Sequence, residues 1–179
     1  MNPSIAYSQR TNNYHVINQV QVSSKKIKIA YDIVKDGRVE SYTLVSAEKA
    51  RPEFYEAMHG LCSHVASLLE IDYNGVEERV HPKNVKFGYD GQGKMSAVID
   101  ADFTLPLGKT SVGIRTPQKQ EPIDSEVDID EKYFFFPSTV DQLRLVQDEA
   151  EKFILGERAQ GQLFSNDKKF RTNFYDLLQ

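Results

Sequence analysis

Alternating apolar and polar positions in the first third of the chain predict a β-hairpin. Apolar side chains occupy every second position over 27–33 and resume over 39–45. Because successive side chains of a strand point to opposite faces, a two-residue period indicates a half-buried strand. The Asp36-Gly37 pair between the two runs favours the type I′ turn that joins hairpin strands. Residues 14–22 show a similar alternation and predict a further edge strand.

A second hairpin is predicted between residues 85 and 105. Residues 85–89 and 95–105 have strand character, and the glycines at 90–93 favour a turn between them. Residues 111–116 predict one more short strand. The glycines and lysine of this turn lack the spacing of a phosphate-binding loop, so we interpret the turn as structural.

Apolar side chains three and four residues apart predict a long helix that begins at Pro52 and ends before Asn74-Gly75. A second long helix is predicted from Thr139, which is expected to cap it together with Gln142, to a stop at Gly156. The apolar stripes that the two helices would bury are Phe54, Met58, Leu61, Val65 and Leu68, and then Val140, Leu143, Val146, Ala150 and Ile154.

The order of these elements predicts an α+β fold. We expect an antiparallel sheet of about five strands built from hairpins, covered by two long helices and followed by a C-terminal tail. Residues 14–156 would form the single domain, after a flexible N-terminus at 1–13. Within the domain, residues 118–132 are acidic and interrupted by proline, which predicts a mobile loop. Residues 157–179 form the tail, where apolar spacing predicts a short amphipathic helix.

Composition narrows the classes of protein that fit the chain. Of its 179 residues, 40% are hydrophobic and 27% are charged, as in a globular domain. The net charge of −4 is opposite to that of proteins that grip duplex DNA by its phosphates, and it favours a basic protein surface as a partner. The sequence shows neither a signal-peptide core nor an apolar run that could cross a bilayer. These features predict a cytoplasmic protein of a bacterial host cell, without a membrane partner.

The single cysteine, Cys62, excludes a disulfide framework and a thiolate metal site within one chain. It lies one helical turn from His59, which suggests a cysteine–histidine pair, but such a pair needs a third group to orient it. A small cysteine beside an apolar stripe is commonly buried instead. His59 and His64 are five residues apart and would point to different faces of the helix.

The carboxylates also fail to form a recognisable site. Asp100 and Asp102 share one strand face and could meet Glu77 or Glu78, although solvated carboxylates are the simpler interpretation. The acidic run at 124–131 lacks the glycine and the spacing of a calcium loop. We therefore predict no enzymatic activity, no catalytic residue, no cofactor and no metal site.

One peptide near the end of the chain does indicate a partner. Gln160, Leu163 and Phe164 form a Gln-x-x-Leu-Phe pattern. It resembles the peptide by which bacterial DNA polymerases and repair proteins dock on the sliding clamp. In that mode the Leu-Phe pair fills an apolar pocket and the glutamine hydrogen-bonds at a second subsite. The alternative is that Leu163 and Phe164 fold back onto the sheet, and the sequence leaves both open.

Basic and aromatic residues are interleaved in the tail, and lysines cluster at one end of the first hairpin. Basic side chains beside aromatic rings can follow a single strand of nucleic acid by phosphate contact and base stacking. The alternative is a solvated charge run beside a packing helix, which the negative net charge favours. The candidate contacts for nucleic acid or a protein partner are Lys25, Lys26, Lys168, Lys169, Phe170, Arg171 and Phe174.

Two segments carry a family resemblance. Residues 51–57, Arg-Pro-Glu-Phe-Tyr-Glu-Ala, and residues 156–164, Gly-Glu-Arg-Ala-Gln-Gly-Gln-Leu-Phe, look like those of uncharacterised proteins carried by phages and prophages of Firmicutes. The resemblance covers roughly residues 27–164 and brings no activity with it. It implies an origin in a mobile element and work in or against DNA transactions.

Three functions are compatible with these observations. The first is a non-enzymatic phage-type binding protein that acts on a bacterial DNA-transaction machine and docks the sliding clamp through Gln160, Leu163 and Phe164. The second is an anti-defence protein that inhibits a host nuclease, such as a CRISPR effector, with the acidic residues 124–131 in a basic channel. The third is a single-stranded-DNA-binding accessory in recombination. A homodimer formed through the amphipathic tail is also open.

Overall fold

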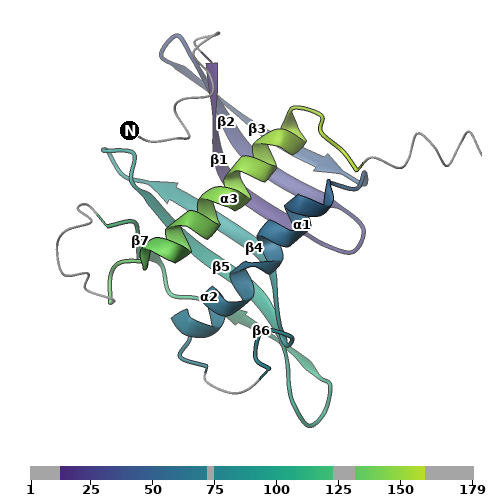
Figure 1. Cartoon of the computed structure of the whole chain (residues 1–179). Helices are drawn as coiled ribbons and strands as arrows, with labels where there is room; N and C mark the ends of the chain where they lie inside the picture. Colours follow the sequence, from purple (N-terminus) through teal and green to yellow (C-terminus); the bar gives the residue numbers. More distant parts are fainter. Residues whose placement is uncertain (1–12, 72–74, 123–131, 160–179) are drawn as a thin grey trace, which may run out of the picture.

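The computed structural model describes residues 13–71, 75–122 and 132–159, which form one antiparallel sheet with helices on one of its faces (Figure 1). The strand order is β3-β2-β1-β4-β5-β6, and β7 pairs with β5 beside this path. The strands are β1 (Asn13–Val22), β2 (Ile27–Lys35), β3 (Arg38–Ser46), β4 (Val80–Tyr89), β5 (Met95–Thr104), β6 (Ser111–Arg115) and β7 (Lys119–Gln120). The helices are α1 (Pro52–His59), α2 (Leu61–Leu68) and α3 (Pro137–Ile154).

The α+β class and the antiparallel sheet are confirmed, but the described residues form a sheet of seven strands rather than about five. The first hairpin forms as predicted, because Asp36 and Gly37 both adopt the positive φ, 50° and 74°, that a type I′ turn requires. β4 begins at Val80, earlier than predicted. The register shifts between Pro82 and Asn84, and this bulge hides the alternation of the strand in the sequence.

The predicted first long helix is wrong as a single element. It consists of two eight-residue segments, α1 and α2, divided at Gly60. At this point the chain passes so close to α3 that a side chain has no room: an added Cβ would lie 2.4 Å from Nε2 of Gln142. The apolar stripe nevertheless continues across the break, since Met58 and Leu61 are both buried. The Gln142 side chain of α3 therefore lies at the point of division, and the same face of the chain is buried on both sides of it.

The cap predicted for α3 is also wrong. The helix begins at Pro137, with Phe136 at the N-cap position and without a side-chain cap. Thr139 is buried instead, and its hydroxyl lies 2.9 Å from Nδ1 of His64 on α2. The Gln142 side chain donates to the carbonyl of Ala57 on α1 at 2.7 Å. The two residues that resemble a capping box therefore hold α3 against α1 and α2.

The core lies between the helices and one face of the sheet. Figure 1 shows α3 lying across the middle strands, with α1 and α2 beside it. Phe54 of α1 and Phe153 of α3 are buried and meet with ring centroids 5.8 Å apart. Burying an aromatic or aliphatic side chain of this size stabilises a fold by about 2 kcal/mol. The largest fully buried side chains are Phe54, Phe135, Phe153, Ile29, Leu61, Ile99, Leu143, Val20, Val65, Val80, Val85 and Val146.

The start of the predicted mobile loop is ordered. Lys119 and Gln120 pair with β5, so the prediction of a loop over 118–132 is wrong at this end. Glu121 is buried, where its carboxylate accepts from Arg144 on α3 and from the amide of Met95. The ion pair between Glu121 and Arg144 therefore holds the end of β7 against α3. Residues 123–131, including the whole acidic run at 124–131, lie outside the described residues.

We predict that the effect of Gly60→Ala depends on Gln142. Gly60 has φ −57° and ψ −17°, a helical conformation that alanine prefers by about 1 kcal/mol. In the wild type the new methyl group displaces the Gln142 amide from its bond to Ala57, so we expect a net loss of about 1 kcal/mol in the free energy of unfolding. In a Gln142→Ala background the same change should stabilise by about 1 kcal/mol. Urea unfolding of the four proteins measures both effects. Equal effects in the two backgrounds would contradict this contact.

Candidate functional site

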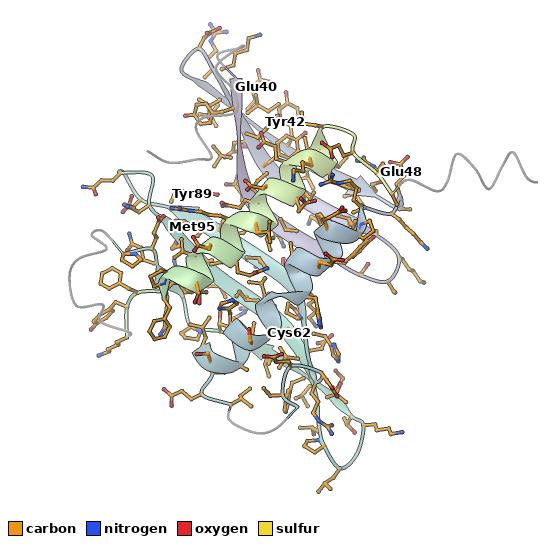
Figure 2. The ribbon with its side chains drawn as sticks, viewed as in Figure 1. Glu40, Tyr42, Glu48, Cys62, Tyr89 and Met95 are labelled. Carbon is orange, nitrogen blue, oxygen red and sulfur yellow. The ribbon has the colours of Figure 1, made fainter. Side chains whose placement is uncertain are left out.

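The last described residues are fastened to the domain by Arg158. Its guanidinium lies 3.7 Å from the ring centroid of Phe153 and donates to Glu48 at 2.7 Å. It also donates to the backbone carbonyl of Phe153. The amide of Ala159 donates to the carbonyl of Lys49 at 3.2 Å. Figure 2 shows Glu48 at this end of the molecule. Residues 157–159, here called the fastened segment, are therefore held on the domain.

Arg51, directly before α1, connects this segment to α3. Its Nη2 donates to both carboxylate oxygens of Glu149, at 2.8 and 3.0 Å, and its Nη1 lies 2.9 Å from the carboxylate of Glu157. Lys152 approaches Glu149 to 2.6 Å. The side chain of Glu149 is only 4% exposed, and a buried charge without such partners is strongly destabilising. Arg51 therefore joins the start of α1, the middle of α3 and the segment after α3.

Two opposing effects set the pKa of Glu149. Burial raises the pKa of its carboxyl, whereas the hydrogen bonds from Lys152 and Arg51 lower it. The net pKa lies below the ordinary value of 4.5, so the carboxylate is charged at neutral pH. The same contact raises the pKa of Lys152, chiefly through its hydrogen bond to Glu149. In the cluster of Arg51, Glu149, Lys152 and Glu157, here called the Arg51 cluster, the charged carboxylate of Glu149 therefore lies between the two cations Arg51 and Lys152.

Most of the predicted site residues lie outside the described residues. These are Gln160, Leu163 and Phe164 of the docking peptide, and Lys168, Lys169, Phe170, Arg171 and Phe174 of the basic tail. Gln160 follows directly after Ala159 in the chain. The fastened segment and the Arg51 cluster therefore define where the predicted docking peptide begins.

Lys25 and Lys26 lie in the exposed turn between β1 and β2. Ser23 organises this turn, because its amide donates to the carbonyl of Lys26 at 2.9 Å and its hydroxyl accepts from the amide of Lys26 at 3.1 Å. In the part of the chain that the structure describes, neither lysine forms a salt bridge. Ile27, the first residue of β2, pairs with Ser46, the last residue of β3. The turn therefore lies at the end of the sheet where β3 ends, three residues before Lys49. The lysine turn and the fastened segment thus share one end of the molecule.

The face of the sheet opposite the helices carries a row of polar side chains. The members of the row are opposite one another on neighbouring strands: Lys28, Gln21, Asn84, Asp100 and Arg115. The side chain of Asn84 donates a hydrogen bond to Asp100 at 2.8 Å and accepts one from Gln19 at 2.7 Å. The guanidinium of Arg115 donates to the carboxylate of Asp100 through both Nε and Nη2. The hydrogen bond from Arg115 is the main reason why the pKa of Asp100 lies below its ordinary value.

These contacts change the interpretation of the strand carboxylates. Asp100 and Asp102 do share a face, but their partners are basic: Arg115 holds Asp100, and Lys83 lies 2.5 Å from Asp102. A shallow hollow of about 390 Å³ lies over the row. Its polar groups bond mainly to one another, so the row stabilises the sheet across its strands. The sequence could not show this network, because it depends on the register between distant strands.

Cys62 lies against His59 but not against His64. The thiol of Cys62 is buried and donates to the carbonyl of Val80 at 3.0 Å, while Nδ1 of His59 lies 3.4 Å from its sulfur. Burial, with a smaller contribution from the charge of Glu77, raises the pKa of Cys62 to about 11. A thiol with that pKa stays neutral at physiological pH, unlike an activated nucleophile. His64 contacts Thr139 instead, and its burial lowers its pKa.

Comparisons of the chain with models of protein families, with curated proteins and with solved structures find no match. Within residues 13–71, 75–122 and 132–159, no group of three or more histidine, cysteine or acidic side chains is arranged to hold a metal ion. None of the helices in these ranges has the length and apolar character needed to cross a membrane. The function of the chain is therefore inferred from its own sequence and contacts.

We predict that the Arg51 cluster stabilises the fold in a pH-dependent way. Because the folded pKa of Glu149 is depressed, its contribution is present above the unfolded pKa near 4.5 and is lost as the pH falls through the folded pKa. Glu149→Gln should lower the free energy of unfolding by about 2 kcal/mol at pH 7. The difference between the two proteins should shrink as the pH falls below about 4.5.

Urea unfolding of both proteins at a series of pH values measures this difference. Asp141→Asn, which changes a carboxylate on the exposed side of the same helix, is the matched control and should have little effect. A difference between wild type and Glu149→Gln that stays constant down to acid pH would contradict the ionic account of the Arg51 cluster.

Proposed function

We propose that this chain is a non-enzymatic, phage-type binding protein that acts on a bacterial DNA-transaction machine in the host cytoplasm. In this proposal Gln160, Leu163 and Phe164 dock on the sliding clamp, and the α+β domain is the cargo that the peptide brings there. The domain has the modest acidity of a protein that meets basic protein surfaces, with a net charge of −4 over the whole chain.

The observation that supports this proposal most is the fastening of the chain immediately before the peptide. Arg158 contacts Glu48 and the ring of Phe153, and the amide of Ala159 donates to the carbonyl of Lys49, so both residues are held on the domain. Gln160 is the next residue. A peptide that starts at a fixed point samples fewer arrangements before it binds, which lowers the entropic cost of docking.

The lysine turn supports a role close to nucleic acid. Lys25 and Lys26 are exposed at the same end of the molecule as Ala159, where they would favour an approach to DNA that a sliding clamp encircles. The same two lysines support the alternative of a single-stranded-DNA-binding accessory. The anti-defence alternative depends on the acidic residues 124–131, which lie outside the described residues.

The test is the affinity of the full-length chain for a purified bacterial sliding clamp, measured by calorimetry or biolayer interferometry. We expect Leu163→Ala/Phe164→Ala to weaken binding by at least about 100-fold, because two apolar anchors of about 2 kcal/mol each are lost. The matched control is Leu177→Ala/Leu178→Ala, which removes another adjacent apolar pair from the same tail and should leave the affinity unchanged. Thermal unfolding should show equal stability for all three proteins.

Two results would overturn the proposal. A large loss of stability in Leu163→Ala/Phe164→Ala would mean that the pair belongs to the core. The other is clamp affinity that does not depend on Leu163 and Phe164, either because binding survives this change or because the wild type does not bind the clamp. Single-stranded DNA binding that Lys25→Glu/Lys26→Glu abolishes would then favour the recombination accessory.

A further inference from the structure

β3 is a long edge strand whose two charged residues, Arg38 and Glu40, both lie near its start. It stands at the end of the strand order, and among the described residues only β2 pairs with it (Figure 1). Its nine residues contain no proline, glycine or lysine, and its register with β2 runs without a shift from Arg38 to Ser46. Natural sheets commonly protect an exposed edge with lysine, proline, a bulge or a short strand. The opposite edge, β6, is only five residues long.

The free edge of β3 offers a regular set of backbone donors and acceptors. The two-residue turn makes Lys35 and Arg38 a hydrogen-bonded pair, and such pairs alternate along an antiparallel ladder. Arg38, Glu40, Tyr42, Leu44 and Ser46 therefore turn their amide and carbonyl groups toward β2. The residues between them, Val39, Ser41, Thr43 and Val45, turn theirs away from the sheet.

The side chains of β3 are self-complementary when β3 of a second copy is placed antiparallel to it, with the two Tyr42 residues opposite each other. Val39 then stands opposite Val45 of the other copy, and Ser41 stands opposite Thr43. Apolar groups meet apolar groups, and hydroxyls meet hydroxyls. All four of these residues direct their backbone groups away from β2, so this register also forms about eight backbone hydrogen bonds between the two copies.

The exposure and charge of β3 fit the same arrangement. Val39 and Val45 are 62% and 54% exposed, which is high for valine on a strand. The register places Arg38 opposite Ser46 and Glu40 opposite Leu44, so it avoids contacts between like charges. Glu40 also accepts a hydrogen bond from the hydroxyl of Tyr42 at 2.5 Å within its own strand, and Figure 2 labels both residues.

We propose that β3 pairs with β3 of a second copy of this chain. The result is an isologous dimer with a two-fold axis at Tyr42 and one continuous sheet through both subunits. This dimer surface is separate from the proposed clamp-docking peptide and does not depend on it.

Cysteine cross-linking of the full-length chain tests the register. The two copies of Tyr42 would form a non-hydrogen-bonded pair with Cα atoms about 4.5 Å apart, within the range that a disulfide spans. Tyr42→Cys should therefore cross-link under mild oxidation, and so should a mixture of Arg38→Cys with Ser46→Cys. Glu40→Cys is the matched control, because its two copies would lie four residues apart along the strands, about 13 Å. The natural cysteine, Cys62, is buried.

Sedimentation of charge variants tests the same pairing without a covalent bond. The wild type should change from monomer to dimer as its concentration rises through about 10 to 100 µM. Val39→Lys/Val45→Lys places lysine against lysine at two positions and should weaken the dimer by at least about 10-fold. Val39→Lys/Val45→Glu places opposite charges there and should restore it.

Several results would overturn the proposal. One is a wild type that stays monomeric over this range, including the case in which residues 160–179 of the same chain occupy β3. Another is Glu40→Cys cross-linking as readily as Tyr42→Cys, which would indicate random collision. A third is dimerisation that both charge variants leave unchanged, which would place the dimer contact elsewhere.

Discussion

The buried carboxylate of Glu149 is the constraint on which the arrangement of this end of the molecule depends. A charge that is 4% exposed needs partners, and Arg51 and Lys152 provide them. To reach Glu149, Arg51 must stand at the start of α1, which fixes α1 against α3. The same guanidinium then holds Glu157, and with Arg158 it keeps the chain on the domain up to Ala159. The position of the residues that directly precede the proposed docking peptide thus depends on an ion cluster around one buried carboxylate.

The polar groups on the open face of the sheet stabilise the fold, whereas those at the β3 edge are available to a partner. On the open face, Asn84 and Asp100 bond to neighbouring strands and to Arg115, so these groups are largely satisfied within the domain. At the edge, the outward amides and carbonyls of β3 have no strand opposite them among the described residues. This difference is why we attribute stability to the polar row and association to β3.

The sequence could predict what depends on near neighbours in the chain. The turn at Asp36-Gly37 and the apolar stripe of α1 and α2 follow from local chemistry, and both appear in the structure. The contact of Gln142 with Ala57 and Gly60 at the division between α1 and α2 could not be predicted, because Gln142 comes from the distant helix α3. The same holds for Arg51 and Glu149, which are 98 positions apart in the sequence. In the candidate site, the exposed position of Lys25 and Lys26 was predictable from a polar turn, whereas their place beside the fastened segment depends on the register of β2 and β3.

We propose that this chain docks on the sliding clamp through a peptide that begins directly after the fastened segment. The most direct measurement is a competition between the full-length chain and a free synthetic peptide with the sequence of residues 157–168 for a purified bacterial sliding clamp. The account predicts that the peptide displaces the chain completely and that the chain binds about 10-fold more tightly than the peptide, because its start is held in place. A chain that binds the clamp and is not displaced by saturating peptide, or a chain that does not bind the clamp, would contradict the account.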